Sequence, residues 1–267
     1  MVGPGGQSRE TGRRIGRQRS MILHIPHSSC TIPEEFRDQI VLSDEDLGAE
    51  LRLMTDAFTD ELFALPETAV VRFPVSRLLV DVERFPDDTE EPMSKVGMGI
   101  IYTLTAYGKK LRRPLQAHEV RNLVSRYYEA HHQALLAEVI EELEKYGKSL
   151  IIDCHSFSSQ PLPCDKDQST MRPDFCLGTD LFHTPSALAH MAARYIEEMG
   201  FTVGVNRPFA GSLVPMTFYR KDHRVASIMI EVNRRLYMDE LTGAKSGRFD
   251  STREQIRTLL VSIREFQ

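Results

Sequence analysis

Short apolar runs, each bounded by turn-forming or polar residues, recur along the chain from residue 22 onward. Runs of this length and composition are typical of buried β-strands. They predict strands over residues 22–25, 69–73, 78–82, 150–154, 175–178, 201–205 and 226–232.

Between these runs, apolar residues recur every three or four positions, which places them on one face of a helix. The pattern predicts helices over residues 44–65, 115–146, 186–199 and 250–266. In the first of these, the apolar face comprises Leu47, Leu51, Met54, Phe58 and Leu62. Gly147 and Gly200 are typical C-terminal stops for the second and third.

Strands that are apolar at nearly every position and alternate with helices are typical of a parallel sheet covered on both faces. The pattern therefore predicts an α/β fold with three layers, in which helices cover both sides of a mainly parallel mixed sheet. Two long segments, 85–113 and 206–223, fit no element. Loops of this length in a compact domain are often functional, unless they contain a hairpin that the pattern does not reveal.

The chain has 267 residues, of which 41% are apolar and 27% charged, as in an ordinary globular domain. We expect one domain over residues 21–267. Residues 1–20 contain five arginines, one acidic residue and little apolar content. A secretory signal needs an apolar stretch, which this segment lacks. We therefore interpret the segment as a disordered basic extension.

The formal net charge of −5 argues against a nucleic-acid partner, which needs a concentrated basic face. No apolar run approaches the roughly 18–20 residues of a membrane helix. The four cysteines form no CxxC pair, so we expect reduced thiols in a reducing compartment. A soluble cytoplasmic protein with a small-molecule partner is the expectation.

Polar residues follow the first apolar run. In open α/β sheets, ligands bind beyond the carboxyl ends of the strands. His24 lies within the run and is expected to play a supporting role, whereas His27 follows Pro26 and projects from the strand end. A loop histidine that is hydrogen-bonded to backbone is the structural alternative for His27.

Asp153 and His155 lie at the end of the fourth run. Residues two apart on a strand point to the same side, which suits two metal ligands, or one ligand with an orienting acid. The alternative is a capped strand end. Cys154 faces the opposite side, so a Cys–His nucleophile pair is not expected.

Glu231 lies inside the last apolar run. A buried carboxylate is costly unless it is paired with a cation or a metal. It is either a general base or one half of an ion pair with Arg84, Arg234 or Arg235. Three clusters of His, Asp and Glu at strand ends together favour a metal site.

Arg77 and Arg84 flank the run at 78–82. They suit bidentate binding of a substrate carboxylate, although pairing with Asp81 or Glu83 is the simpler alternative. No GxSxG elbow, P-loop or GxGxxG motif follows a predicted strand.

These motifs resemble those of the N-formylglutamate amidohydrolase family, from about Ile22 to about Tyr237. The matching positions are His24 to Ser28, Thr55, Asp56, Ser76, Arg77, Asp81, Arg84, Tyr127, Tyr128, His132, Asp153 to Ser156, Cys176 to Asp180, Asn206, Pro208, Phe209, Gly211 and Glu231. The family's architecture is similar to that of zinc exopeptidases.

The resemblance implies that His27 and His155 are metal ligands and that Glu231 is the base. It also implies that Arg77, Arg84 and Arg234, with the loop at Asn206 and Gly211, bind substrate, and that Arg77 or Arg84 stabilises the oxyanion. Zinc carboxypeptidases take a glutamate ligand three residues after the first histidine, but this position is Cys30 here. We therefore expect Asp56 as the third ligand, with Cys30 and Asp153 as alternatives.

The resemblance further implies Zn²⁺, or another divalent ion such as Co²⁺, and hydrolysis of N-formyl-L-glutamate to formate and L-glutamate in histidine degradation. Glu83, where many relatives have Asn, and the stretch 213–215 depart from the family pattern. Hydrolysis of a different N-acyl amino acid therefore stays open. So does a non-catalytic protein of the same fold that binds a dicarboxylate or a metal.

Overall fold

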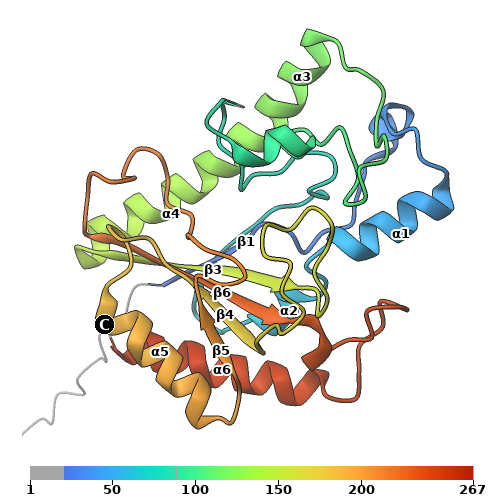
Figure 1. Ribbon diagram of the computed structural model, residues 1–267. Coiled ribbons are helices and arrows are strands. Elements are labelled where there is room, and N and C mark those ends of the chain that lie inside the picture. Colours follow the sequence, from blue (N-terminus) through green and yellow to red (C-terminus); the bar gives the residue numbers. More distant parts are fainter. Residues whose placement is uncertain (1–20, 88, 267) are drawn as a thin grey trace, which may run out of the picture.

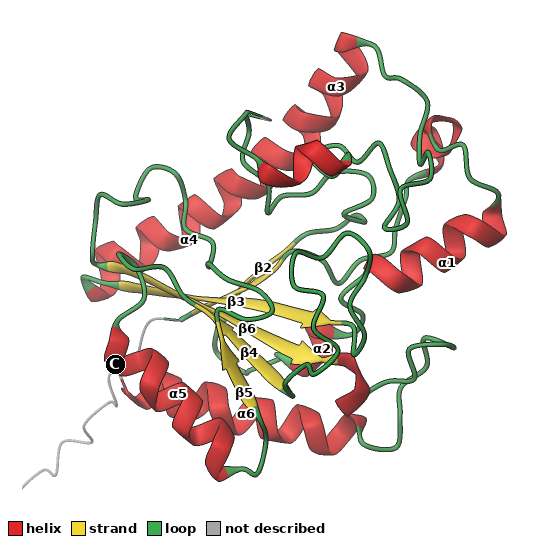
Figure 2. Ribbon diagram, in the orientation of Figure 1, coloured by secondary structure: helices red, strands yellow, loops and turns green. Residues whose placement is uncertain are grey.

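The computed structural model describes residues 21–87 and 89–266, so the predicted extension over 1–20 lies outside the described residues. Its strands are β1 (Ile22–Ile25), β2 (Ala69–Arg72), β3 (Ser149–Phe157), β4 (Phe175–Gly178), β5 (Val203–Val205) and β6 (Val225–Asn233). They form one six-stranded sheet in the order β2-β1-β3-β6-β4-β5 (Figure 2).

The strands β2, β1, β3 and β6 pair in parallel. β4 pairs with β6 in the antiparallel direction, and β5 runs parallel to β4. The predicted mainly parallel mixed sheet is confirmed.

Helices lie on both faces of the sheet. They are α1 (Asp44–Met54), α2 (Thr59–Leu62), α3 (Ala117–Leu123), α4 (Ala130–Tyr146), α5 (Ser186–Glu198) and α6 (Phe249–Phe266). The 3-10 segments are η1 (Glu34–Gln39), η2 (Pro92–Val96) and η4 (Arg234–Leu236), and η3 (Val124–Glu129) is a π-helix. Figure 1 shows α4 across one face and α5 and α6 across the other, which confirms the three layers. Among the described residues, no helix has the length and apolarity needed to cross a membrane.

Alternation along the central strands separates an apolar face from a partly polar one. On one face, Leu23, Ile152 and Ile230 pack in a core that also contains residues of α2, α5 and α6. On the other face, Ile22 and Ile151 pack with apolar residues of α4. His24, Asp153, His155 and Glu231 are at positions that point to this second face, so these residues and α4 lie on the same side of the sheet.

Three predicted elements differ from the structure. The helix predicted over 44–65 is broken, because Thr55 is extended and α2 begins only at Thr59. The strand predicted over 78–82 is a series of turns, in which the apolar side chains are nevertheless buried. The helix predicted over 115–146 is continuous but changes to π geometry in η3, between α3 and α4.

The segment over residues 85–113, for which no element was predicted, contains short regular structure. Residues 85–113 contain η2 and isolated antiparallel bridges, Leu104 to Lys110 and Ile40 to Arg112. The buried Arg112 guanidinium donates to the carbonyl of Leu78 and so ties this segment to the turns at 78–82. The short bridge at Leu104 is the local pairing that the apolar pattern did not reveal.

Candidate active site

Strand register brings the polar residues together. In the parallel pairing of β1 with β3, His24 is the direct partner of Asp153. In the pairing of β3 with β6, His155 is the direct partner of Glu231. Aligned residues of parallel neighbours point to the same face, so these four side chains lie on one side of three central strands. β3 continues to Phe157 and β6 to Asn233. The site therefore lies on the last few residues of the strands rather than beyond their ends.

His27, Asp56 and His155 form one cluster. One ligand atom from each lies within 4.8 Å of the others, and all three residues are buried. Oδ2 of Asp56 is 3.0 Å from Nδ1 of His155 and 3.7 Å from Nδ1 of His27. The break between α1 and α2 makes this possible, because the backbone N–H of Asp56 donates to the carbonyl of His27.

The other ring nitrogen of each histidine is held by a carboxylate. Nε2 of His27 donates to Oδ1 of Asp81 at 2.9 Å, and Nε2 of His155 donates to Oδ1 of Asp153 at 3.0 Å. Burial favours neutral acids, yet Arg77 and Arg84 hold the pKa of Asp81 well below its usual range. Both rings therefore turn Nδ1 toward Asp56.

The cluster fits a zinc ion. Nδ1 of His27 is buried and has no hydrogen-bond partner among the described residues, which is costly unless a ligand satisfies it. Two imidazoles and a carboxylate are common zinc ligands, and bonds of about 2.1 Å at the tetrahedral angle separate ligand atoms by about 3.4 Å. Carboxylates on the far nitrogens are the usual supports of metal-binding histidines.

The two alternatives for the third ligand lie elsewhere. Cys30 is exposed and does not line the cavity of the site. Asp153 contacts Nε2 of His155 and also Nδ1 of His24, at 2.8 Å. Its carboxylate therefore orients His155 from behind, while Asp56 faces both Nδ1 atoms.

Glu231 faces the cavity without an ion-pair partner. Its Oε2 is buried and accepts no hydrogen bond from any residue that the structure describes. The three arginines that could have paired with it bind aspartates instead: Arg84 contacts Asp81, Arg234 contacts Asp56, and Arg235 contacts Asp174. Burial raises the pKa of Glu231 to about 8, against the attraction of His155.

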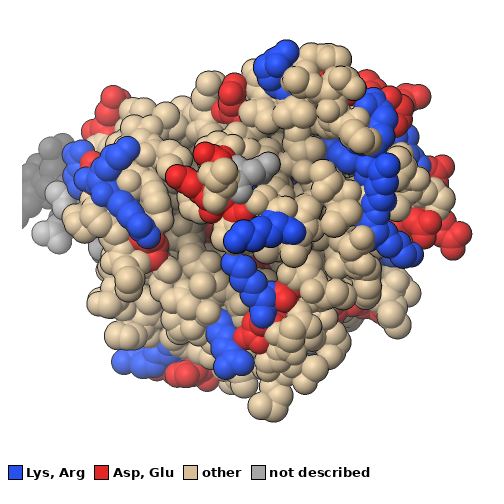
Figure 3. Space-filling view, turned by 45° about the horizontal axis from the view of Figure 1, so that its top comes forward, with Lys and Arg blue, Asp and Glu red and all other residues tan. Residues whose placement is uncertain are grey.

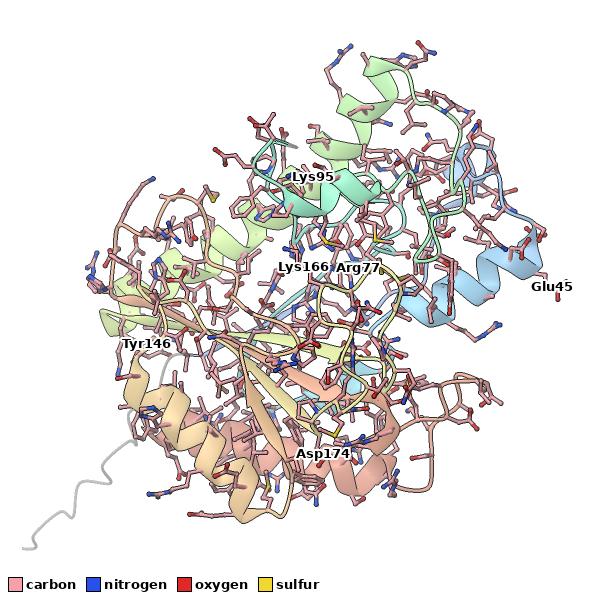
Figure 4. The ribbon with its side chains drawn as sticks, in the orientation of Figure 1. Glu45, Arg77, Lys95, Tyr146, Lys166 and Asp174 are labelled. Carbon is pink, nitrogen blue, oxygen red and sulfur yellow. The ribbon has the colours of Figure 1, made fainter. Side chains whose placement is uncertain are left out.

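A cavity of about 400 Å³ opens over the cluster and over Glu231. Pockets for small molecules measure roughly 300–1,000 Å³. Its charged lining includes His27, Asp56, Arg77, Glu83, Arg84, His155, Asp165, Lys166, Arg172, Glu231 and Arg234. Figure 4 labels Arg77 and Lys166 near each other at this place, on two different loops. On the face shown in Figure 3, basic and acidic side chains are interspersed.

The arginines of the cavity are largely neutralised by the protein. Arg77 donates through Nε and Nη2 to Asp81, and Arg172 donates to Asp165 at 2.6 Å. All three nitrogens of Arg234 donate, to Ser156, to the carbonyl of Leu53 and to Asp56. Arg234 is therefore placed to hold Asp56.

The loop after β5 does not lie as expected. Asn206 does not line the cavity, because its side-chain amide is bonded to Thr179 in both directions at 2.7 and 2.8 Å. The structure therefore does not bring Asn206 together with the other predicted substrate-binding residues. Gly211 lines a smaller adjoining chamber of about 230 Å³. Its carbonyl lies so close to Gly178 that a Cβ there would be 2.2 Å away.

Several residues of the site were not identified as functional from the sequence. Asp81 is buried and receives bonds from His27, Arg77 and Tyr102, yet its neighbours suggested only a local ion pair. Lys166 and Arg172 lie in a loop without periodicity. Their proximity to the cavity depends on the path of that loop, for which the sequence carries no signal.

Comparison with known proteins gives a consistent result. The family model described as N-formylglutamate amidohydrolase matches residues 19–238. No curated protein is similar enough in sequence to match the chain. The chain resembles the crystal structure of N-formylglutamate amidohydrolase from Ralstonia eutropha JMP134, with a TM-score of 0.82, 24% identity, and coverage of 94% of this chain and 95% of that one.

It also resembles the crystal structure of the gene product Atu2144 from Agrobacterium tumefaciens, with a TM-score of 0.58, 20% identity and coverage of 92% of each chain. At these identities the two structures show a shared fold. The family model spans well over half of the chain, so this protein belongs to the N-formylglutamate amidohydrolase family.

Proposed function

We propose that this protein is a metal-dependent amidohydrolase that removes the formyl group from N-formyl-L-glutamate, releasing formate and L-glutamate. The observation that carries the proposal is the pairing of two unsatisfied buried atoms in one cavity, Nδ1 of His27 and Oε2 of Glu231. The first suits a metal ligand, and the second suits a proton acceptor beside it.

We assign His27, Asp56 and His155 as the ligands of Zn²⁺, or of a similar ion such as Co²⁺. Three protein ligands leave one position open, which is the usual arrangement of a catalytic rather than a structural zinc site. When bound, the ion would lower the pKa of water and polarise the amide carbonyl.

The protein's own residues account for the proton transfers. Glu231 accepts the proton of the attacking water at Oε2 and returns it to the nitrogen of the leaving amine. Negative charge then develops on the former carbonyl oxygen. Nη1 of Arg77 donates to no described residue, so it is free to stabilise that charge, with Arg84 as the neighbouring donor. Loss of one such donor typically costs about 2.7–4 kcal/mol of transition-state stabilisation.

Lys166 supports the proposal that the substrate has an acidic side chain. It lines the cavity and is exposed, and no described residue forms an ion pair with it. The cavity arginines, in contrast, bind aspartates of the protein. We therefore assign Lys166 as the cation that binds the side-chain carboxylate of the substrate, whereas Arg77 and Arg84 lie near the reacting amide.

The experiment that tests the proposal is a substrate panel. The purified full chain is incubated with N-formyl and N-acetyl derivatives of glutamate, glutamine and methionine, with added Zn²⁺ or Co²⁺, and amine release is followed. We expect N-formyl-L-glutamate to give the highest kcat/KM and a chelator to abolish it. Zinc binding without turnover of any derivative would instead favour the non-catalytic alternative.

A further inference from the structure

A second group of potential ligand atoms lies behind the first cluster, on His24, Glu83 and Asp153. One atom from each of these side chains lies within 4.8 Å of the others. His24 and Asp153 are direct partners in the register of β1 and β3, so the sheet itself places two of the three. Glu83 is positioned by its backbone N–H, which donates to Oδ1 of Asp81.

The distances within this group are short enough for its atoms to share one metal ion. Nδ1 of His24 is 3.4 Å from Oε1 of Glu83 and 2.8 Å from Oδ1 of Asp153. Nε2 of His155 is 3.9 Å and 3.0 Å from the same two oxygens. A tetrahedral ion with bonds of about 2.1 Å separates its ligand atoms by about 3.4 Å. The four measured separations lie on both sides of that value. The two shortest, both to Oδ1 of Asp153, are hydrogen bonds that a bound ion would replace.

One of these atoms lacks a partner. Oε1 of Glu83 is buried and accepts no hydrogen bond within the described chain, despite its closeness to His24. A buried carboxylate oxygen without a donor loses the hydrogen bonds that it made to water. A cation between Glu83 and Asp153 would satisfy it.

His24 has the support that metal-binding histidines usually have. Its Nε2 lies 2.8 Å from Nε2 of His131, which follows the π segment η3 at the start of α4. A partner on the far nitrogen fixes the ring with Nδ1 toward Oδ1 of Asp153, and a bound ion would replace the hydrogen bond between these two atoms. A single-turn π insertion inside a longer helix is frequent at functional sites.

An ion can reach this group. Glu83 and Asp153 line the smaller chamber of about 230 Å³, and Glu83 also lines the main cavity. The group therefore lies at the wall between the two chambers rather than in the closed core.

We propose that His24, Glu83 and Asp153 form a second divalent-metal site, with Nε2 of His155 at its fourth corner. His155 would then lie between two ions, with Nδ1 toward the first and Nε2 toward the second. Its remaining ring proton passes to solvent when both ions are bound. Imidazole and carboxylate ligands suit Zn²⁺ and ions of similar character. This inference does not depend on the proposed reaction.

The number of metal ions per chain tests this site. The full chain is saturated with Zn²⁺, freed of unbound ion and analysed for zinc and protein. Wild type is expected to hold two ions, and Glu83→Gln one, because the amide keeps the shape but loses the anionic ligand. Glu50→Gln is the matched control and is expected to hold two. Glu50 is also buried, but it accepts from the backbone N–H of Ala106 and is not part of the group.

Two further variants assign the ions. His24→Asn is expected to hold one ion, which repeats the test from another ligand if Glu83→Gln does not fold. His27→Ala removes a ligand of the first cluster only and is also expected to hold one. A single zinc in saturated wild type that is kept in Glu83→Gln and His24→Asn, or two in both of these variants, would overturn the second site. If that single zinc is lost in His27→Ala while wild type releases formate, the proposed function stands and only this inference fails.

Discussion

At the scale of single residues, the site depends on acids that hold other side chains in place. Asp81 and Asp153 each accept a hydrogen bond from the far nitrogen of a histidine, and Arg234 donates to Asp56. Supporting partners of this kind keep a ligand's ring in one orientation, and their loss typically weakens metal affinity by about 10–100-fold. The geometry of the cluster is therefore set by at least as many residues around the ligands as by the ligands themselves.

Lys166 determines the preference for an acidic substrate in this account. We expect Lys166→Met to raise KM for N-formyl-L-glutamate by about tenfold, because a charge-assisted contact is lost. KM for N-formyl-L-glutamine, which is neutral at that end, should not change. Steady-state kinetics with both substrates provide the measurement.

Lys95 provides the matched control for that substitution. It is an exposed lysine of η2, labelled in Figure 4, and it does not line the cavity. Lys95→Met should leave both KM values unchanged. Equal changes in KM for the two substrates in Lys166→Met would show that Lys166 does not distinguish a charged from a neutral substrate.

At the scale of elements, departures from regular helical structure position residues of the site and of its surroundings. The break at Thr55 brings Asp56 to the histidines, and the π segment η3 brings Tyr128 to the carbonyl of Arg84 and His132 to that of Val82. The apolar spacing of residues 44–65 is the same with or without the break, so the sequence pattern cannot reveal it.

The helix end at Gly147 shows a local signal that was sufficient for prediction. Gly147 ends α4 with φ 75°, in the left-handed region, and no atom would contact an added Cβ. Gly147→Ala should therefore lower the free energy of unfolding by roughly 1–2 kcal/mol through backbone strain alone.

Gly247 provides the comparison for Gly147. An added Cβ there also meets no atom, but its φ lies outside the left-handed region. Gly247→Ala should leave stability within about 0.5 kcal/mol of wild type. Urea unfolding of the two variants measures the difference, and equal stabilities would contradict the assigned helix end.

At the scale of the whole molecule, alternation along β1, β3 and β6 puts apolar side chains under α5 and α6 and the polar site under α4. Short apolar runs and their alternation with helical patterns were readable from the sequence, so the positions of most strands and the layers were predicted. The two-residue spacing of Asp153 and His155 predicted their shared face. The order of the strands, the turns at 78–82 and the course of residues 158–174 depend on tertiary contacts. For that reason the surroundings of the site, including Asp81 and Lys166, were not predicted.

The first cluster also joins distant segments, because its residues come from the end of β1, the α1–α2 break and β3. An ion bound only by the folded chain stabilises it by about 4 kcal/mol when present at about 1,000 times its Kd. For a chain of this size, we expect chelation to lower Tm by on the order of 10 °C. Differential scanning calorimetry with and without a chelator tests this, and an unchanged Tm would mean that no such ion is bound.

The proton-accepting role of Glu231 is the central claim, and kcat of Glu231→Gln tests it most directly. The amide keeps the shape of the side chain but cannot accept the proton of water. With N-formyl-L-glutamate and Zn²⁺, we expect kcat to fall by about 10²–10⁴-fold while metal content and fold stay as in wild type. A kcat within twofold of wild type under these conditions would contradict the account.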